Sequence, residues 1–417
     1  NPSGTERSDR NTMKRPDSTT VSIIVCIVII AVLSLSLVFV INERNNEQDL
    51  NVAALTELAD TIDSQYYFYD DKELDGDKLV EGAMRGMIST LDDPYAQYYT
   101  EEEYNKLLKS NSGNYVGIGI SIQVPDETGS KVIEVYSGGP AEKAGLAVGD
   151  IITKVNGTEV ANLTLDAVLA CFDTAEDASN EITFLHDGVE NTISIVSAEI
   201  HINRVISTVY NGTIGYIRIT EFNGSVEQDF WNAVTVLRAE GIQNLIIDLR
   251  NNPGGGLSEV LAMTDHFVAE GDVIVTIKSK TGEEDVYTSN GSEQTGMKLA
   301  VLVNGNSASA SELFTGALKD YGLATIIGTQ TYGKGIVQSY FRIPATGGWA
   351  KMTTDAYYTP SGVCIQGTGI TPDIVIDLPE ELKDTALDEL DPMEDTQLQA
   401  AFSVFGSQTQ LPQTANG

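Results

Sequence analysis

Residues 298–338 read KLAVLVNGNSASASELFTGALKDYGLATIIGTQTYGKGIVQ, and this stretch decides the fold. KLAVLVN is an apolar run typical of a buried strand, and it leads into a helix that ends at Gly322. ATIIG is a second such strand, and NLIIDL, which begins at Asn244, is a third that runs into the glycine-rich turn 250–257. Strands that alternate with helices predict an α/β core whose functional groups lie in the loops after the strands.

Ser309 lies where one of these strands leads into its helix. A side chain there sits at the positive end of the helix dipole, beside backbone N–H groups that the helix leaves unbonded, and this setting favours an oxyanion. An isolated serine at such a position is more often an N-cap, and Ser309-Ala310-Ser311-Glu312 also fits a capping box. The case for Ser309 as a nucleophile therefore depends on a base elsewhere in the chain.

Lys334 is the candidate base. Glycines flank it in an otherwise apolar stretch, so burial would lower its pKa and leave a neutral amine able to accept a hydroxyl proton. Gln338 follows four residues later, a spacing that puts two side chains on the same side of a strand or a helix. The amide of Gln338 is therefore expected to orient the amine of Lys334.

Between residues 112 and 198 the chain changes to short β-rich runs punctuated by glycine. YVGIGI, which begins at Tyr115, and the later GGPAEKAGLAVGDIITKVNGTEV resemble a PDZ domain. In that family a peptide adds as a strand to the edge of the sheet, and backbone N–H groups of a glycine-containing loop bind its terminal carboxylate. The resemblance implies that the carboxylate-binding residues are Gly117, Ile118, Gly119 and Ile120.

From about residue 50 to residue 378 the chain resembles the bacterial carboxyl-terminal processing proteases, also called tail-specific proteases. Several motifs carry this resemblance, in the order typical of the family: Gly117-Ile118-Gly119-Ile120, Asp248-Leu249-Arg250-Asn251-Asn252-Pro253-Gly254-Gly255, Ser307-Ala308-Ser309-Ala310-Ser311-Glu312, Thr331-Tyr332-Gly333-Lys334-Gly335-Ile336-Val337-Gln338 and Gly369-Ile370-Thr371-Pro372-Asp373. The chain departs from the family at Val363-Cys364, where polar or basic residues are more usual.

This resemblance implies a role for each candidate residue. Ser309 would be the nucleophile, Lys334 the general base and Gln338 the residue that orients the base. The oxyanion hole would be formed by the backbone N–H of Ala310 and by that of one glycine of the pair Gly254 and Gly255. The family also implies a core similar to ClpP and the crotonases, with an inserted or preceding PDZ domain, and no cofactor.

The expected organisation has a membrane segment before the folded domains. VSIIVCIVIIAVLSLSLVFVI contains no charge and as a helix would span about 31 Å, enough to cross a bilayer. The expected regions are a cytoplasmic tail at 1–20, a transmembrane helix at 21–41, a helical region at 42–111, a PDZ domain at 112–198, a serine protease core at 199–378 and an acidic tail at 379–417.

The flanking charges predict the orientation of this membrane segment. Four basic residues precede it, whereas Arg44 follows it among acidic residues, so the amino terminus is expected in the cytoplasm and the remaining domains outside the bacterial cell membrane. A cleaved signal peptide is the alternative, but the apolar run is longer than usual and lacks an Ala-x-Ala-like cleavage site.

Charge and composition exclude several classes of function. The chain has 25 Lys and Arg against 60 Asp and Glu, a net charge of −35, which would repel a nucleic acid backbone. The few cysteines and histidines show no metal-ligand spacing, so no metal site is expected. A triad built on His266 has no supporting spacing, and the acidic segment after Leu378 is expected to be a solvated helix and a disordered end.

We therefore expect a membrane-anchored serine endopeptidase that cleaves near the C-termini of proteins or peptides with free carboxyl ends. The alternative is a catalytically inactive, membrane-tethered PDZ scaffold. Retention of serine, lysine and glutamine argues against the scaffold, because binding alone requires none of these residues. The resemblance also makes a homodimer plausible.

Overall fold

A computed structural model describes residues 52–69, 74–136 and 138–406. These residues belong to two compact units, one up to Ala83 and the other from Met84 onward. The predicted cytoplasmic tail and transmembrane helix, residues 1–41, lie outside the described residues. Within the described ranges no helix has both the length and the apolar character needed to cross a membrane.

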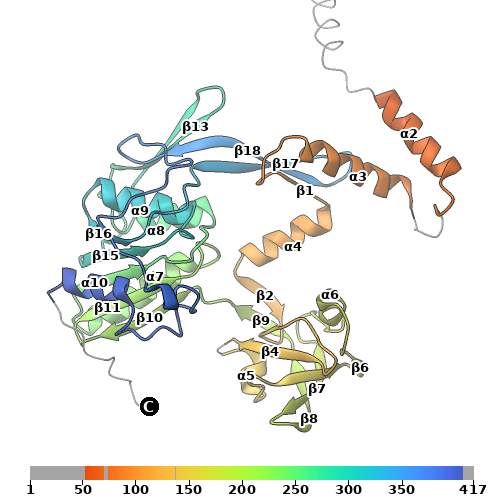
Figure 1. Cartoon of the computed structure of the whole chain (residues 1–417), viewed down its shortest axis with the longest axis horizontal. Coiled ribbons are helices and arrows are strands. Elements are labelled where there is room, and N and C mark those ends of the chain that lie inside the picture. The colour runs from red at the N-terminus through yellow and green to blue at the C-terminus, as the bar shows by residue number, and fades with distance from the viewer. Residues whose placement is uncertain (1–51, 70–73, 137, 407–417) are drawn as a thin grey trace, which may run out of the picture. The chain divides into compact units, whose positions relative to one another are not determined.

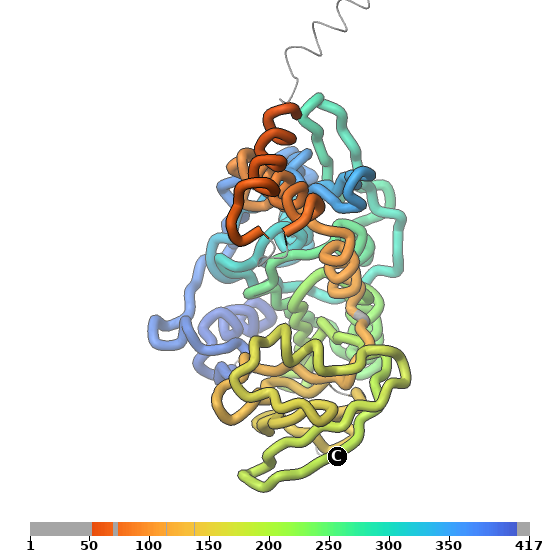
Figure 2. Tube along the Cα trace, turned by 90° about the vertical axis from the view of Figure 1, so that its right-hand side faces the viewer, coloured from red at the N-terminus to blue at the C-terminus, as the bar shows by residue number. Residues whose placement is uncertain are grey.

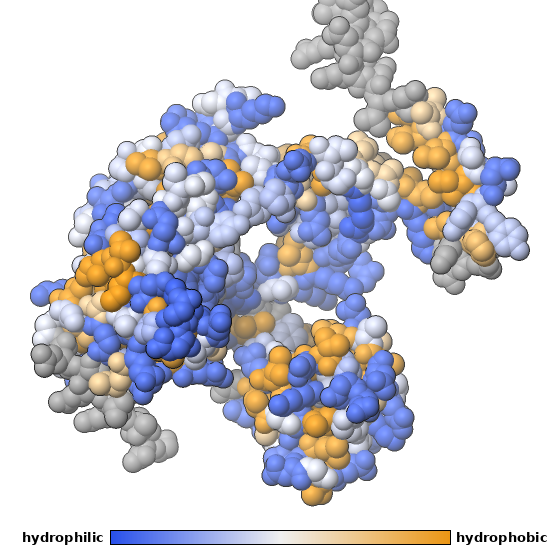
Figure 3. Space-filling view, viewed as in Figure 1, coloured by the Kyte–Doolittle hydropathy of each residue, from blue (hydrophilic) through white to orange (hydrophobic). Residues whose placement is uncertain are grey.

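The first unit consists of helix α2 (Val52–Gln65) and the beginning of α3 (Gly76–Ser89). No residue of α2 is buried, and Val52 and Leu58 are 64% and 57% exposed. Figure 3 shows this apolar surface in orange on α2. Both helices fall within the region that the sequence predicts to be helical.

The second unit begins with the end of α3, strand β1 (Gln97–Tyr99) and helix α4 (Glu101–Asn111). Thr100 caps α4: its hydroxyl accepts from the N–H of Glu103, whose carboxylate accepts from the N–H of Thr100. Arg85 donates two hydrogen bonds, of 2.9 and 2.8 Å, to the same carboxylate. This ion pair joins α3 to the start of α4 and fixes the segment between them, which carries Asp93 and Tyr95.

Residues 114–201 form the β-rich PDZ region, drawn from orange through yellow to yellow-green in Figure 2. Its main sheet has the order β3-β4-β5-β7-β8, so β3 is an edge strand, and β6 pairs with β5. The apolar core includes Val132, Ile152 and Ile182, which are fully buried. The elements are β2 (Asn114–Gly117), β3 (Ile120–Ile122), β4 (Ser130–Val135), α5 (Pro140–Lys143), β5 (Ile151–Val155), β6 (Thr158–Glu159), α6 (Leu165–Leu169), β7 (Ser179–His186), β8 (Val189–Val196) and β9 (Ala198–His201), which pairs with β2.

The central sheet of the core has the order β10-β11-β12-β15-β16-β19, parallel except for β10. Helices follow strands β11, β12 and β15, as the alternating pattern predicts (Figure 1). One face of the sheet packs with these helices through residues such as Ile247, Phe230 and Phe314. The elements are β10 (Val205–Tyr210), β11 (Ile214–Ile219), α7 (Val226–Ala239), β12 (Asn244–Asp248), α8 (Leu257–Thr264), β15 (Lys298–Val303), α9 (Ala310–Asp320), β16 (Ala324–Gly328) and β19 (Ile374–Val375).

The C-terminal segment corrects the prediction of a solvated acidic tail. After a short 3-10 turn, Glu380–Leu382, helix α10 (Thr396–Val404) packs against β15 and β16 on the second face of the sheet (Figure 1). Leu398, Ala401 and Phe402 are buried there. The overall acidity of the segment hid this short apolar stripe, whose burial favours docking of the helix.

A smaller sheet brings distant segments to the side of the core that carries the candidate residues. Its order is β1-β18-β13-β14, and β17 pairs with β18. Through this sheet β1, which follows α3 in the chain, lies in register with Trp349 and Lys351. The strands are β13 (Val273–Ser279), β14 (Glu284–Thr288), β17 (Ile336–Arg342) and β18 (Trp349–Tyr358).

Candidate active site

Ser309 occupies the turn between β15 and α9 with φ 55° and ψ −113°. A positive φ with this ψ lies outside the regions that L-residues normally occupy, and such strain persists only where the surroundings hold it. The turn presents the side chain at the first turn of α9, in the setting that the sequence predicts. A serine at a strained turn between a strand and a helix is also how some hydrolases expose a nucleophile.

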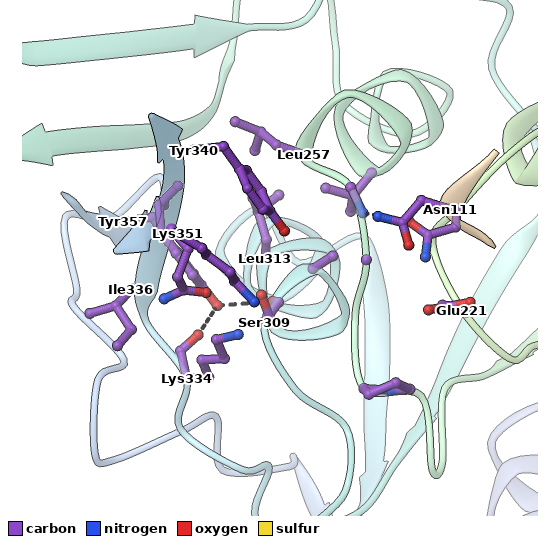
Figure 4. Close-up of a pocket in the computed structure, with 18 of the residues that line it drawn as sticks. Asn111, Glu221, Leu257, Ser309, Leu313, Lys334, Ile336, Tyr340, Lys351 and Tyr357 are labelled. Atoms are coloured by element: carbon purple, nitrogen blue, oxygen red, sulfur yellow. Dashed lines mark hydrogen bonds between the residues drawn. The ribbon is translucent and has the colours of Figure 1, made fainter. Parts of the chain in front are cut away.

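Ser309, Lys334 and Gln338 line one cavity of about 410 Å³ (Figure 4). The structure therefore brings together three residues that come from two separate sequence motifs. The rest of the lining is largely apolar, with polar groups at Glu221, Asn223, Lys351 and the Asn111 end of α4. A cavity that combines apolar side chains with several convergent polar groups is typical of a ligand-binding site.

Lys334 is half-buried, and this burial lowers the pKa of its ammonium. The positive charge of Lys351 lowers that pKa further, whereas the carboxylates of Asp93 and Glu312 act in the opposite direction. The net direction agrees with the prediction that burial makes the neutral amine accessible.

The amine of Lys334 is not bonded to Ser309 in this conformation. Its Nζ lies over the ring of Tyr95, 4.3 Å from the ring centre, and within the described residues no hydrogen bond joins Lys334 Nζ to Ser309 Oγ. Catalytic hydrogen bonds are often long or misaligned without substrate and tighten only in the complex. In this conformation the serine and the lysine share a cavity, and no hydrogen bond joins their side chains among the described residues.

The expected pairing of Gln338 with Lys334 is not formed. The amide of Gln338 donates instead to Thr353 Oγ1 at 3.2 Å, and no hydrogen bond to Lys334 occurs in the described part of the chain. Lys334 precedes β17, and the register shifts between Val337 and Gln338. The regular spacing that puts residues i and i+4 on one side therefore does not apply here.

Glu312 of α9 connects the serine loop with the lysine loop. Its side chain is completely buried. One carboxylate oxygen accepts from the N–H groups of Ser309 and Lys334, at 2.9 and 2.8 Å. The other accepts from the hydroxyl of Thr331 at 2.6 Å and from the N–H of Gly333 at 2.7 Å. One carboxylate thus holds the backbone of both proposed catalytic residues.

Tyr357 of β18 makes a second connection between these two loops. Its buried hydroxyl lies 2.9 Å from the carbonyl oxygen of Ser309 and 2.6 Å from that of Lys334, as the dashed lines in Figure 4 show. Glu312 binds the N–H groups of the two residues, and Tyr357 binds their carbonyl groups. The relative position of the two loops is therefore fixed from both sides.

The glycine-rich turn after β12 lies against the serine loop. A side chain at Gly254 would come within 2.9 Å of Ser309 Cβ and of the backbone nitrogen of Ala310, so only glycine fits there. The N–H of Gly254 already donates to Asn252 Oδ1 at 2.9 Å. In contrast, no acceptor for the N–H of Gly255 or of Ala310 is present among the described residues. Of the N–H groups predicted for an oxyanion hole, those of Ala310 and Gly255 are therefore free, whereas that of Gly254 is occupied.

A buried ion-pair network supports this turn from behind. Arg250 donates to Asp248 and to Asp395 at the start of α10, and all three side chains are buried. Tyr216 donates to Asp248 at 2.8 Å. The C-terminal helix therefore helps to hold the glycine-rich turn, and Asp395 at its start is buried in this network rather than solvated.

In the PDZ region, Gly117, Ile118 and Gly119 are buried and Ile120 is half-buried. Gly119 has φ 84°, a value that favours glycine. The N–H of Tyr136 donates to the carbonyl of Gly119, and Ile120 pairs with Val135 on β4. Among the described residues the other edge of β3 has no partner strand, which is the edge where the PDZ resemblance predicts that a peptide adds.

The competing candidates do not contribute to the cavity. Both ring nitrogens of His266 have partners elsewhere, Glu227 Oε1 at 2.6 Å and the carbonyl of Glu293 at 2.8 Å. His266 does not line the cavity. Among the described residues no cluster of His, Cys, Asp and Glu could hold a metal ion.

Sequence reasoning missed four residues near the candidate catalytic pair. Asp93 and Tyr95 belong to a segment that looked only like the end of a helix, Lys351 lies on a strand without a local signal, and Tyr357 precedes a second tyrosine. Asp93-Pro94-Tyr95 was the one sequence signal available for these residues. Proline alone can end a helix, so the charge and the aromatic ring beside it indicated a further role.

Comparison with known proteins identifies the class. The model of peptidase family S41 matches residues 213–376, a PDZ domain model matches 131–185, and the N-terminal domain of the activating protease CtpB matches 39–103. A probable CtpA-like serine protease of Staphylococcus aureus strain MSSA476 is 35% identical over 360 residues, which cover 85% of this chain and 71% of that protein.

A probable CtpA-like serine protease of Staphylococcus epidermidis is 36% identical over 338 residues, which cover 81% of this chain and 67% of that protein. A solved structure of a photosystem II D1 C-terminal processing protease is 30% identical, with a TM-score of 0.46, and covers 76% of this chain and 89% of that one. The chain belongs to peptidase family S41, the C-terminal processing proteases. It is a serine-type peptidase with a PDZ domain.

Proposed function

We propose that Ser309 is the nucleophile of this peptidase, that Lys334 is its general base, and that a PDZ-bound carboxyl end delivers the substrate. The observation that carries the proposal is the position of Ser309 at a strained turn in the same cavity as a half-buried lysine. Rotation of the Lys334 side chain away from Tyr95 brings the amine to the hydroxyl in the reactive complex.

The reaction is an acyl transfer. Neutral Lys334 takes the hydroxyl proton while Ser309 Oγ attacks the peptide carbonyl, and the oxyanion accepts from the N–H groups of Ala310 and Gly255. Lys334 then returns the proton to the leaving amine as the peptide bond breaks, which leaves an acyl-enzyme. Water, activated in the same way, releases the acyl product and restores Ser309. Gln338, freed from Thr353, orients the amine.

The substrates are proteins or peptides with free carboxyl ends, cleaved near those ends. The terminal carboxylate binds at Gly117–Ile120, and the peptide adds to the open edge of β3. The helix at 21–41 anchors the enzyme in the bacterial cell membrane, with the PDZ and protease regions outside the cytoplasm. A core of the ClpP and crotonase type and assembly into a homodimer belong to the same proposal.

A matched set of peptides tests the selection of carboxyl ends. We expect kcat/KM for a free-acid peptide to exceed that for its C-terminal amide by about tenfold, the effect of about 1.4 kcal/mol of binding. An amide with Asp as its last residue keeps the negative charge but lacks the terminal carboxylate, so it should behave as the amide. Equal cleavage of all three peptides would remove carboxylate capture from the proposal.

The pH dependence of cleavage tests the role of Lys334. A general base must be neutral, so kcat/KM should rise with pH through the lowered pKa of Lys334 and reach its plateau below the pH range of an ordinary lysine. The rate of labelling by a fluorophosphonate, which reacts at the serine, should follow the same curve. A profile without a rising part below the pH range of an ordinary lysine would contradict a neutral Lys334 as the base.

A further inference from the structure

A second lysine lines the cavity that holds Ser309 and Lys334. Lys351 comes from β18, where it pairs in register with Tyr340 of β17. It is half-buried, and its ammonium lies 6.0 Å from the centre of the Tyr340 ring. Figure 4 shows Lys351 and Lys334 on the same side of the cavity as Ser309. The proposed function assigns no task to Lys351.

Lys351 has no counter-ion in contact with it. Across the described residues the recorded ion pairs engage lysines such as Lys278, Lys319 and Lys383 with carboxylates, whereas Lys351 has neither an ion pair nor a hydrogen bond through Nζ. A half-buried ammonium without a partner carries a desolvation cost. Among the described residues the carboxylate that acts on its charge is that of Asp93, which makes neither an ion pair nor a hydrogen bond with it.

The other charged groups around Lys334 favour its protonated form. Asp93 lies before β1 and Glu312 belongs to α9, and both attract a positive charge. The ring of Tyr95 also favours an ammonium at its face. Besides burial, Lys351 is the group that opposes protonation of Lys334.

Protonation of one lysine therefore disfavours protonation of the other, because both are half-buried in one cavity. Two like charges that share such a site cannot both ionise easily, so a proton on one weakens the binding of a proton by the other. Burial also lowers the pKa of Lys351, and Asp93 opposes that effect. The Tyr340 ring on its own side of the cavity stabilises the charge on Lys351.

We propose that Lys351 is a positioning residue for peptide cleavage that acts through its charge: its ammonium disfavours a second positive charge on Lys334 and so maintains the neutral base. This inference rests on the proposed function of Lys334. It gives the unpaired lysine a role in the reaction rather than in the stability of the sheet.

The test compares Lys351→Met with Lys351→Arg by the pH profile of kcat/KM, using a free-acid peptide as the probe. Loss of the charge in Lys351→Met should move the rising limb to higher pH. The rate at pH 7 should fall by about tenfold, the order expected for one partly screened charge nearby. The plateau at high pH should remain. Lys351→Arg keeps the positive charge, so kcat/KM should rise over the same pH range as in the wild type.

Controls separate this inference from its alternatives. Lys298→Met removes an exposed lysine of β15 and should leave the profile unchanged, which controls for net charge. Lys351→Gln is a second uncharged variant for use if Lys351→Met does not fold. The inference would be overturned if kcat/KM of Lys351→Met and Lys351→Gln rose over the wild-type pH range, or if only KM changed in these variants. Activity in Lys334→Met would instead overturn the proposed function itself.

Discussion

Ser309→Ala and Lys334→Met are each expected to lower kcat by about 10⁴-fold or more, because the nucleophile and its base act as one unit. In Ser309→Ala the oxyanion donors and the cavity remain, but no acyl-enzyme can form. In Lys334→Met the hydroxyl remains but keeps its proton. Peptide cleavage and fluorophosphonate labelling measure both losses.

The double variant and an arginine variant make this prediction sharper. Ser309→Ala combined with Lys334→Met should be no slower than either single variant, since each already removes the shared step. Lys334→Arg keeps a long cationic side chain that stays protonated, so it should be as inactive as Lys334→Met. Ser403→Ala, on the exposed side of α10, serves as the control. Substantial cleavage by Lys334→Arg would exclude a neutral amine as the base.

The sequence allowed the main parts of the site to be predicted because they are local. Ser309 follows an apolar strand and precedes a helix, and glycines flank Lys334, so each environment can be inferred from neighbours in the chain. The order of strands and helices predicted the α/β core in the same way, and the structure shows its central sheet to be parallel except for β10. These features depend on hydrophobic pattern and turn chemistry, which short segments encode.

The remaining parts arise from contacts between distant segments. Lys351 approaches Lys334 only because β18 pairs with β17, and Tyr95 reaches Lys334 through the pairing of β1 with β18. The predicted pairing of Gln338 with Lys334 was wrong for a related reason, because a register shift between β17 and β18 breaks the regular i to i+4 spacing. Asp395 was counted among solvated acids, although Arg250 makes it part of the buried network. Single-sequence periodicity contains no information on such pairings.

Glu312 shows how a correct local pattern can hide a larger role. Ser309-Ala310-Ser311-Glu312 was recognised as a capping box, and Glu312 does accept from the N–H of Ser309. The same carboxylate also accepts from Thr331, Gly333 and Lys334, which belong to the loop after the next strand. A capping box at the start of a solvent-exposed helix needs its N3 carboxylate to accept from one N–H group, whereas the carboxylate of Glu312 joins two loops.

Glu312→Gln is therefore expected to impair both stability and catalysis despite its nearly identical shape. All four partners of the carboxylate are donors, and an amide has only one oxygen to offer them. Whichever way the amide turns, its NH₂ group faces two donors, and two buried hydrogen bonds are lost. At about 1–3 kcal/mol for each unsatisfied buried group, the free energy of unfolding should fall by about 2–6 kcal/mol.

Kinetics distinguish this effect from simple unfolding. At a temperature where circular dichroism shows Glu312→Gln to be fully folded, we expect kcat to fall by about 10²-fold, since a small displacement of a reacting group can cost that much. KM for a peptide held by the PDZ region should change little. Glu240→Gln, an exposed change at the end of α7, should leave both thermal stability and kcat as in the wild type. Wild-type kcat in folded Glu312→Gln would mean that Tyr357 alone suffices to align Ser309 with Lys334, because its hydroxyl contacts the carbonyl groups of both.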